Sequence, residues 1–156
     1  MSENNSIGRV SKEIEERGTS TVNIEQNKQV AKEFVEATIK RDADRVASVM
    51  SDDVTLKVFG KHPRFQRVWT KSEWCKYLQT PSPFVDSHLA LTIRTITAED
   101  DRVSVETETY GTIAANGKIY NNTYHYMFTI RDGKIVNIRE YMDTQHINDV
   151  LPAPTR

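Results

Sequence analysis

The sequence predicts an α+β fold in which three N-terminal helices are followed by an antiparallel sheet that curls around them. Three observations support this fold class. Apolar residues recur at helical spacing in the first half of the chain, and from about residue 87 they alternate with polar residues in the period of a β-strand. The sequences ANG and RDG separate the last alternating segments and are typical of short hairpin turns.

The first helix is predicted from its cap and its apolar face. It begins at Asn23, which is followed three residues later by Gln26 in the pattern of a capping box, and it ends at about Lys40. Residues that recur at helical spacing would form its inner face: Val30, Ala31, Phe34, Val35 and Thr38.

Further helix starts are indicated by polar residues that cap N-termini. Asp42 is expected to cap a short second helix, and Thr70 with Glu73 forms the capping box of a third. Asp143 follows the last alternating segment and is expected to cap one more short helix.

The strands are predicted from alternation. One strand precedes the third helix and four long strands follow it, at 53–60, 87–97, 102–114, 118–130 and 134–142. The segment 61–69 contains Pro63 and is expected to be irregular.

The chain of 156 residues predicts one domain at 23–151, with tails at 1–22 and 152–156. Its net charge is -1, and its 21 Lys and Arg residues are spread along the chain, which argues against nucleic-acid binding. No apolar run reaches membrane-spanning length and no leader sequence is recognised, so we expect a cytoplasmic protein with no membrane contact. The single cysteine, Cys75, excludes an internal disulfide and a cysteine-rich metal site.

The most distinctive motif is RDGKIVNIREYMDTQH at 131–146. Together with DVTLKVFG after the first two helices, it resembles the SnoaL-like branch of the nuclear transport factor 2-like superfamily, over about residues 23–150. That group includes ketosteroid isomerases, limonene epoxide hydrolases, scytalone dehydratases and polyketide cyclases. The resemblance implies a cone-shaped homodimer with an apolar pocket for a small hydrophobic molecule, and no cofactor is expected.

The resemblance also indicates which strand face lines the pocket. Ile138, Glu140 and Met142 share one face of the last strand, and the matching positions line the cavity in similar isomerases and epoxide hydrolases. Counting back through the hairpin turns places further residues on the same face: Asn122, Tyr124, Tyr126, Phe128, Thr107, Thr109 and Gly111.

The chain departs from the residue sets of two related reactions. The general base of the isomerases falls at Val58, and their oxyanion-hole aspartate falls at Tyr126. The arginine and aspartate that the epoxide hydrolases add fall near Thr109 and Gly111. Neither mechanism is therefore expected in the form those enzymes use.

Glu140 is the main candidate for catalysis. In an apolar cone its charged form would be disfavoured, which raises its pKa toward the range of a general acid or base. Tyr126, or alternatively Tyr124, could orient this carboxyl or donate a hydrogen bond to an oxygen that gains charge. The alternative is structural: Glu140 could be tied by hydrogen bonds to these tyrosines or to a buried basic group.

These residues predict proton-transfer chemistry of lyase, cyclase, isomerase or hydrolase type on a small hydrophobic organic molecule. The alternative is a non-catalytic module for small-ligand binding or dimerisation. The predicted catalytic residues are Glu140 and Tyr126, and the predicted substrate-binding residues are Asn122, Tyr124, Phe128, Thr109, Val58, Trp69, Trp74, Ile138 and Met142.

Other polar residues are expected to lie outside the site. Glu106 and Glu108 alternate opposite to neighbouring valines, which favours the convex surface, although a bulge could reverse their facing. His125 and His146 lack companions at metal-ligand spacing, so no metal site is expected. A dimer is predicted through the convex face, with Val136, Tyr141, Met127 and Thr129 exposed in a single chain.

Overall fold

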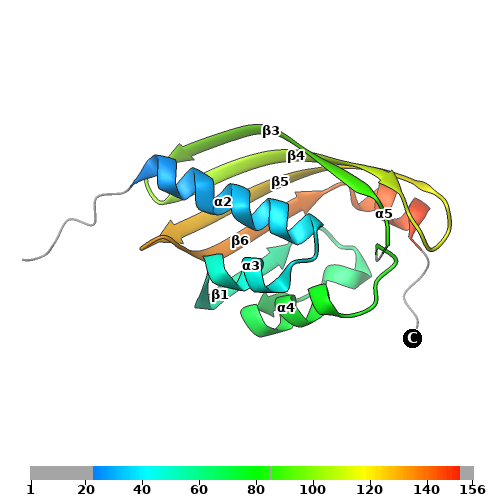
Figure 1. Cartoon of the computed structure of the whole chain (residues 1–156), viewed down its shortest axis with the longest axis horizontal. Helices are drawn as coiled ribbons and strands as arrows, with labels where there is room; N and C mark the ends of the chain where they lie inside the picture. Colours follow the sequence, from blue (N-terminus) through cyan, green and yellow to red (C-terminus); the bar gives the residue numbers. More distant parts are fainter. Residues whose placement is uncertain (1–22, 85, 152–156) are drawn as a thin grey trace, which may run out of the picture.

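The computed structural model describes residues 23–84 and 86–151, and the two predicted tails, 1–22 and 152–156, lie outside the described residues. In this part of the chain a six-stranded sheet curves around helices that lie on its concave side (Figure 1). The first helices precede most of the strands along the chain. This α+β architecture confirms the predicted fold class.

Four α-helices are described: α2 (Ile24–Ile39), α3 (Ala43–Val49), α4 (Lys71–Gln79) and α5 (Thr144–Val150). Their N-termini confirm the predicted caps at Asn23, Asp42, Thr70 and Asp143. Each cap side chain accepts a hydrogen bond from a backbone N–H of the first turn, at 2.9 Å between Asn23 Oδ1 and the nitrogen of Gln26. Local polar signals therefore place all four helix starts.

The strands are β1 (Met50–Val58), β2 (Val68–Thr70), β3 (Leu89–Glu99), β4 (Arg102–Thr112), β5 (Ile119–Arg131) and β6 (Lys134–Met142). Their order in the sheet is β2-β1-β6-β5-β4-β3. The last four strands form the predicted antiparallel meander.

Two features of the sheet differ from the prediction. Strand β1 pairs with β6 in parallel, so the sheet is mixed rather than fully antiparallel. Strand β2 lies within a segment that was expected to be irregular, and it pairs with β1 at the edge of the sheet. Strand β6 is distant from β1 in sequence, and β2 is only three residues long. Neither pairing therefore leaves a periodic signal in the sequence. The 3-10 helix Pro63–Phe65 precedes β2.

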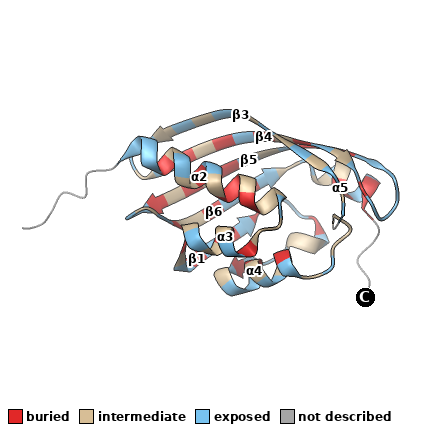
Figure 2. Ribbon diagram, in the orientation of Figure 1, coloured by how far each residue is buried: buried red, intermediate tan, exposed pale blue. Residues whose placement is uncertain are grey.

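One face of the sheet is buried against the helices, as Figure 2 shows by the buried residues on β4, β5 and α2. Val103 and Val105 of β4 are fully buried, whereas Glu106 is exposed and Glu108 forms an ion pair with Arg94 of β3 on the outer face. The two glutamates therefore lie on the convex surface, as predicted. Phe34 of α2 meets Phe128 of β5 edge to face, with ring centroids 5.5 Å apart.

Helix α5 packs across one end of the sheet. Ile147 of α5 joins Ile113 and Tyr120 in a small buried cluster, separate from the main core. This cluster closes the end of the cone opposite to the start of α2 (Figure 1). Among the described helices, none has both the length and the apolar content needed to cross a bilayer.

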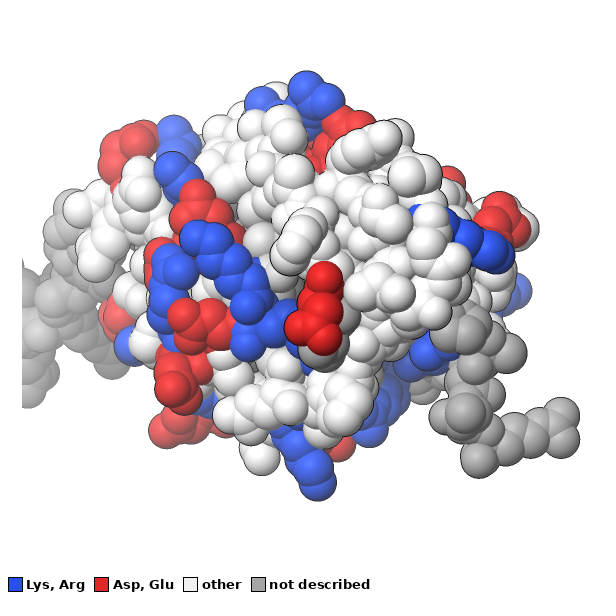
Figure 3. Space-filling model, turned by 45° about the vertical axis from the view of Figure 1, so that its right-hand side comes forward, with Lys and Arg blue, Asp and Glu red and all other residues white. Residues whose placement is uncertain are grey.

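Charged side chains are mixed in sign on the face drawn in Figure 3, where a broad uncharged area lies beside them. Most ion pairs on the described surface join residues close in sequence or on neighbouring helices or strands, such as Arg45 with Glu33 at 2.7 Å. Exposed pairs of this kind contribute little to stability. The stability of the domain therefore depends mainly on the core between the helices and the sheet.

Candidate active site

A cavity of about 120 Å³ lies between the helices and the concave face of the sheet. Its wall is mostly apolar and aromatic, and residues from α2, α4, β1 and all four strands of the meander contribute to it. Its volume is close to the ~150 Å³ of an engineered protein cavity that binds benzene. The cavity can therefore enclose an apolar group of about the size of one aromatic ring.

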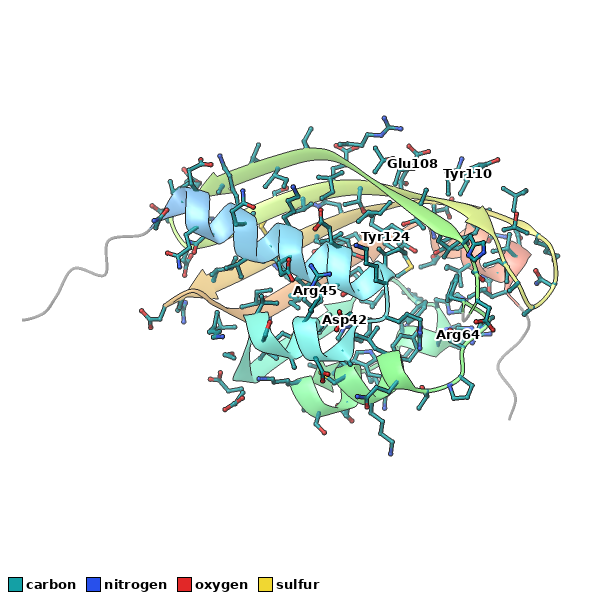
Figure 4. All side chains as sticks on the ribbon, viewed as in Figure 1. Asp42, Arg45, Arg64, Glu108, Tyr110 and Tyr124 are labelled. Atoms are coloured by element: carbon teal, nitrogen blue, oxygen red, sulfur yellow. The ribbon has the colours of Figure 1, made fainter. Side chains whose placement is uncertain are left out.

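Seven of the eleven predicted site residues line this cavity: Val58, Trp74, Thr109, Tyr124, Tyr126, Glu140 and Met142. They come together because the side chains of β4, β5 and β6 alternate, and every second one points inward. Figure 4 shows Tyr124 beneath the end of α2, with Glu108 and Tyr110 on the outer side of the sheet.

The other four predicted residues are buried outside the cavity wall: Asn122, Phe128, Ile138 and Trp69. Phe128 and Ile138 pair across β5 and β6 closer to the middle of α2, where Phe34 fills the space above them. Trp69 packs against Trp74 with ring centroids 5.5 Å apart. The strand residues therefore lie on the predicted face of the sheet, but their position along the strands relative to the cavity was not predicted.

Asn122 has a structural task in this arrangement. Its Oδ1 accepts a hydrogen bond from the nitrogen of Asp143 at 3.1 Å, and its Nδ2 donates to the Asp143 carbonyl oxygen at 3.2 Å. The same Nδ2 lies 3.2 Å from the hydroxyl of Tyr120. Asn122 therefore holds the end of β6 and the start of α5 against β5.

Glu140 is the single acidic side chain of the cavity wall among the residues that the structure describes. It is only 4% exposed, and its carboxyl group forms no hydrogen bond or ion pair within residues 23–84 and 86–151. Burial raises the pKa of Glu140 from 4.5 to about 8. The strand itself is fixed, since the Phe59 nitrogen donates to the Glu140 carbonyl oxygen at 2.8 Å.

Val58 pairs with Glu140 across the parallel β1–β6 ladder, and both residues line the cavity. The position that matches the isomerase base is thus an apolar wall facing the carboxyl. A valine there cannot form a hydrogen bond to the Glu140 carboxyl or share its proton. A hydrogen-bond partner of the Glu140 carboxyl would therefore have to be a molecule inside the cavity.

The cavity tyrosines differ in their hydrogen bonds. Tyr124 shares a hydrogen bond with Tyr120, whose hydroxyl also contacts Asn122. Tyr126 lies directly opposite Glu140 across β5 and β6, and its hydroxyl has no hydrogen-bond partner in the described part of the chain. Of the tyrosines on β5, Tyr126 is therefore the one whose hydroxyl donor remains available.

All four cavity tyrosines stay neutral over the physiological pH range, and burial is the main cause that raises the pKa of the fourth, Tyr77. Burial, followed by the charge of Glu140, raises the pKa of Tyr126 well above 10. Burial also raises the pKa of Tyr124 well above 10, and it raises that of Tyr120 to about 12. Their hydroxyls can donate hydrogen bonds to an oxygen that gains negative charge, but they do not act as bases at neutral pH.

Gly111 explains why one residue of the epoxide hydrolase set is missing. A Cβ atom at Gly111 would lie 2.4 Å from the carbonyl oxygen of His88, where β4 meets the start of β3. No side chain fits this close approach without a shift of the backbone. With this backbone geometry, the position cannot carry a carboxylate.

The described residues contain no group of three or more His, Cys, Asp or Glu side chains that could hold a metal ion. The histidines instead have local roles. His125 contacts Ser104 Oγ at 2.6 Å on the outer face, and His146 Nε2 accepts from the Asn121 nitrogen at 3.0 Å.

Several cavity residues were not predicted, among them Arg41, Tyr77, Phe84 and Tyr120. Arg41 lies just after Lys40, the C-cap residue of α2, and Phe84 lies in the connection between α4 and β3. Because these positions lie outside helices and strands, the sequence has no periodic pattern that predicts where their side chains point. The signal that could have placed Arg41 is the Asp42 cap, because it fixes a sharp turn between α2 and α3 at the end of the cone.

The sequence matches the family model of the SnoaL-like domain over residues 31–138, which is more than half of the chain. A search of curated protein sequences found no match. The fold is shared with many solved structures.

Three of these structures show the range of the similarity. A proposed SnoaL-like polyketide cyclase from Jannaschia sp. CCS1 is 16% identical with a TM-score of 0.69, over 87% of this chain and 97% of that one. An NTF2-like protein from Burkholderia xenovorans is 19% identical with a TM-score of 0.66, over 84% and 99%. An LEH-like epoxide hydrolase from M. tuberculosis is 19% identical with a TM-score of 0.61, over 81% and 89%.

At these identities the structural similarity establishes the fold and not the activity. The family model, the shared fold and the cavity on the concave face of the sheet agree with one another. This chain belongs to the SnoaL-like domain family.

Proposed function

We propose that this protein is an acid/base catalyst that acts on a small hydrophobic organic molecule, with Glu140 as the proton carrier. The observation that carries the proposal is the Glu140 carboxyl on the wall of an apolar cavity, without a hydrogen-bond partner among the described residues and with a pKa of about 8. A carboxyl with such a pKa can both accept and release a proton near neutral pH.

The unpaired state of Glu140 favours chemistry over a structural role. A buried polar group without a partner costs free energy, and proteins normally satisfy such groups. A structural glutamate would be bonded to a tyrosine or to a basic side chain, and none of the described residues fills that role. The remaining partner is a molecule inside the cavity, either water or the substrate.

Tyr126 completes the proposed site. Its neutral hydroxyl lies on the same face as Glu140 and on the neighbouring strand. While Glu140 moves a proton at one atom of the substrate, Tyr126 would donate a hydrogen bond to an oxygen that gains negative charge. Names of similar structures include a polyketide cyclase and an epoxide hydrolase, which supports a small organic substrate.

The proton-carrier role can be tested without the natural substrate. Nitrobenzisoxazole loses a ring proton to any well-placed base, its N–O bond breaks, and a coloured cyanophenolate forms. We expect the native protein to accelerate this reaction with a pH midpoint of about 8, because only ionised Glu140 is a base. Glu140→Gln should lower the rate by at least about a hundredfold. Glu106→Gln, which changes a glutamate on the outer face, is the matched control.

Binding is followed separately by tryptophan fluorescence, since Trp74 lines the cavity. If Glu140→Gln binds the probe and reacts as fast as the native protein, the proton-carrier role is wrong. If both proteins bind the probe and neither turns it over, the chain is a non-catalytic ligand-binding module.

A further inference from the structure

Arg41 is the single cation on the cavity wall among the residues that the structure describes. It stands at the turn between α2 and α3 in the left-handed conformation, with φ of 55°. A non-glycine residue is uncommon in this region, and here the side chain is anchored at its far end. Arg41 Nη2 donates to the carbonyl oxygens of Tyr77 at 2.7 Å and Thr80 at 2.9 Å, at the end of α4.

These contacts leave the charge of Arg41 without a counter-ion. A guanidinium carries five N–H donors, and the two carbonyl oxygens take those of Nη2. The Tyr77 hydroxyl is a further hydrogen-bond partner of the guanidinium but is neutral, and no carboxylate within the described chain forms an ion pair with Arg41. The result is a positively charged group that is held in place but not neutralised.

Arg41 also lies where the cavity adjoins the surface. An open groove on the surface shares five lining residues with the cavity, among them Arg41, Ile39 and Leu89, and we call this shared part of the wall the mouth. The groove is further lined by Lys40 and His88 and by one acidic residue, Asp86. Positive charge therefore predominates at the mouth, because Arg41 and Lys40 outnumber Asp86.

Arg41 lines both the cavity and the groove, whereas Glu140 lines the cavity alone. Tyr77, another residue of the cavity wall, lies under the Arg41 guanidinium, with 5.4 Å between its ring centroid and Cζ. Burial raises the pKa of Tyr77, Arg41 lowers it and Glu140 raises it, so Tyr77 is electrostatically coupled to both charged groups. A ligand that enters from the groove meets the cation first and the acid deeper in the cavity.

We infer that the substrate is an amphipathic anion, whose carboxylate or similar acidic group binds Arg41 at the mouth while its apolar body fills the cavity and its reacting atom reaches Glu140. This inference rests on the proposed function for the identity of the reacting end. The contact with Arg41 fixes which end of the molecule enters the cavity. Arg41 is thus a positioning residue for the reaction at Glu140.

The test compares two probes of nearly the same shape, hydrocinnamate and its neutral amide, hydrocinnamamide. Each carries one phenyl ring, which matches the size of the cavity, and only the first carries a charge. Binding is measured by tryptophan fluorescence at neutral pH. We expect the native protein to bind hydrocinnamate about tenfold to a hundredfold more tightly than the amide, and high salt should reduce this difference.

Variants then assign the preference to Arg41. Arg41→Gln and Arg41→Gly should both abolish it, and the glycine variant keeps the turn because glycine readily adopts a positive φ. Arg41→Lys should keep part of the preference. Lys32→Gln removes one positive charge from the exposed face of α2 and should behave like the native protein.

The inference is wrong if the native protein binds the two probes equally, if neither probe binds, or if Arg41→Gln and Arg41→Gly keep the preference for hydrocinnamate. Glu140→Gln separates this result from the proposed function, because binding needs no proton transfer. That variant should lose turnover of nitrobenzisoxazole and keep the preference for the anion. If the native protein shows no preference for the anion, the proposed role of Glu140 as proton carrier is not affected.

Discussion

Tyr126 and Glu140 lie directly opposite each other on β5 and β6, both on the concave face, yet no hydrogen bond joins them within the described residues. Each side chain is at least nine-tenths buried, and each lines the same cavity. A donor and a carboxyl that are buried side by side, and are not bonded to each other, can both contact a third group placed between them. The proposed mechanism depends on this arrangement.

Tyr126→Phe should slow the reaction more than it destabilises the fold. The Tyr126 hydroxyl has no partner among the described residues, so its removal should cost less than about 1 kcal/mol of unfolding free energy. Loss of a donor to the developing charge should reduce kcat with nitrobenzisoxazole on the order of a hundredfold. Tyr124→Phe is the control, because it removes the hydrogen bond to Tyr120 and should affect stability more than rate. A Tyr126→Phe enzyme with native kcat would exclude Tyr126 from the mechanism.

Glu140 should make the stability of the domain depend on pH. Its pKa is about 8 in the folded chain and 4.5 as a reference for the unfolded chain. The folded state therefore holds the proton over this interval while the unfolded state has lost it, and stability falls as the pH rises from about 4.5 to about 8. The full effect is roughly 5 kcal/mol, at about 1.4 kcal/mol for each pKa unit.

Urea unfolding at a series of pH values measures this effect, with Glu140→Gln as the comparison because it has no proton to lose. The difference in unfolding free energy between the native protein and the variant should decrease through the interval and become constant above a pH of about 8. Parallel pH profiles for the two proteins would show that Glu140 titrates as an ordinary glutamate.

Asn122→Ala should destabilise the fold without entering the chemistry. The change leaves the backbone N–H and carbonyl of Asp143 without the Asn122 side chain as their partner, and the Tyr120 hydroxyl keeps only its bond to Tyr124. We expect a loss of about 2 to 3 kcal/mol in urea unfolding, since buried polar groups without partners are costly. Asn121→Ala, on the exposed side of the same strand, should be nearly neutral. Equal effects of the two changes would contradict the structural task assigned to Asn122.

We expect the chain to dimerise through the convex face of the sheet. Tyr141 is 40% exposed there and stacks on Phe59 at 4.7 Å between ring centroids, whereas Val136, Met127 and Thr129 are half-buried. Tyr110, which is 54% exposed, extends the same face. Analytical ultracentrifugation at micromolar concentration should show a dimer that Tyr141→Asp weakens. Only monomer in the native protein would refute this expectation.

Much of the fold could be predicted because its signals are local. Caps such as Asn23 and Asp42 act on their own first turns, and alternation along the meander assigns a facing to every second residue. Alternation put Glu140 on one face with Ile138 and Met142, and the resemblance to the SnoaL-like family indicated that this face lines the cavity. The parallel pairing of β1 with β6 joins Val58 to Glu140 across a long stretch of sequence, and no local pattern encodes it.

The unpredicted parts of the site depend on packing between distant segments. Arg41 reaches the cavity because the end of α4 supplies two carbonyl oxygens that hold its side chain. Tyr126 and Tyr124 share one strand face, so alternation cannot tell them apart. Only the contact between Tyr124 and Tyr120 shows which hydroxyl is already bonded.

The central claim is that Glu140 is a carboxyl with a strongly raised pKa in an apolar cavity, and its own titration tests this most directly. Carboxyl-carbon NMR of the protein labelled at glutamate, with Glu140→Gln to assign the resonance, gives the pKa of this single group. We predict a midpoint of about 8. A midpoint near the ordinary glutamate value of 4.5 would contradict the account, because Glu140 would then be fully ionised at neutral pH and could not deliver a proton there.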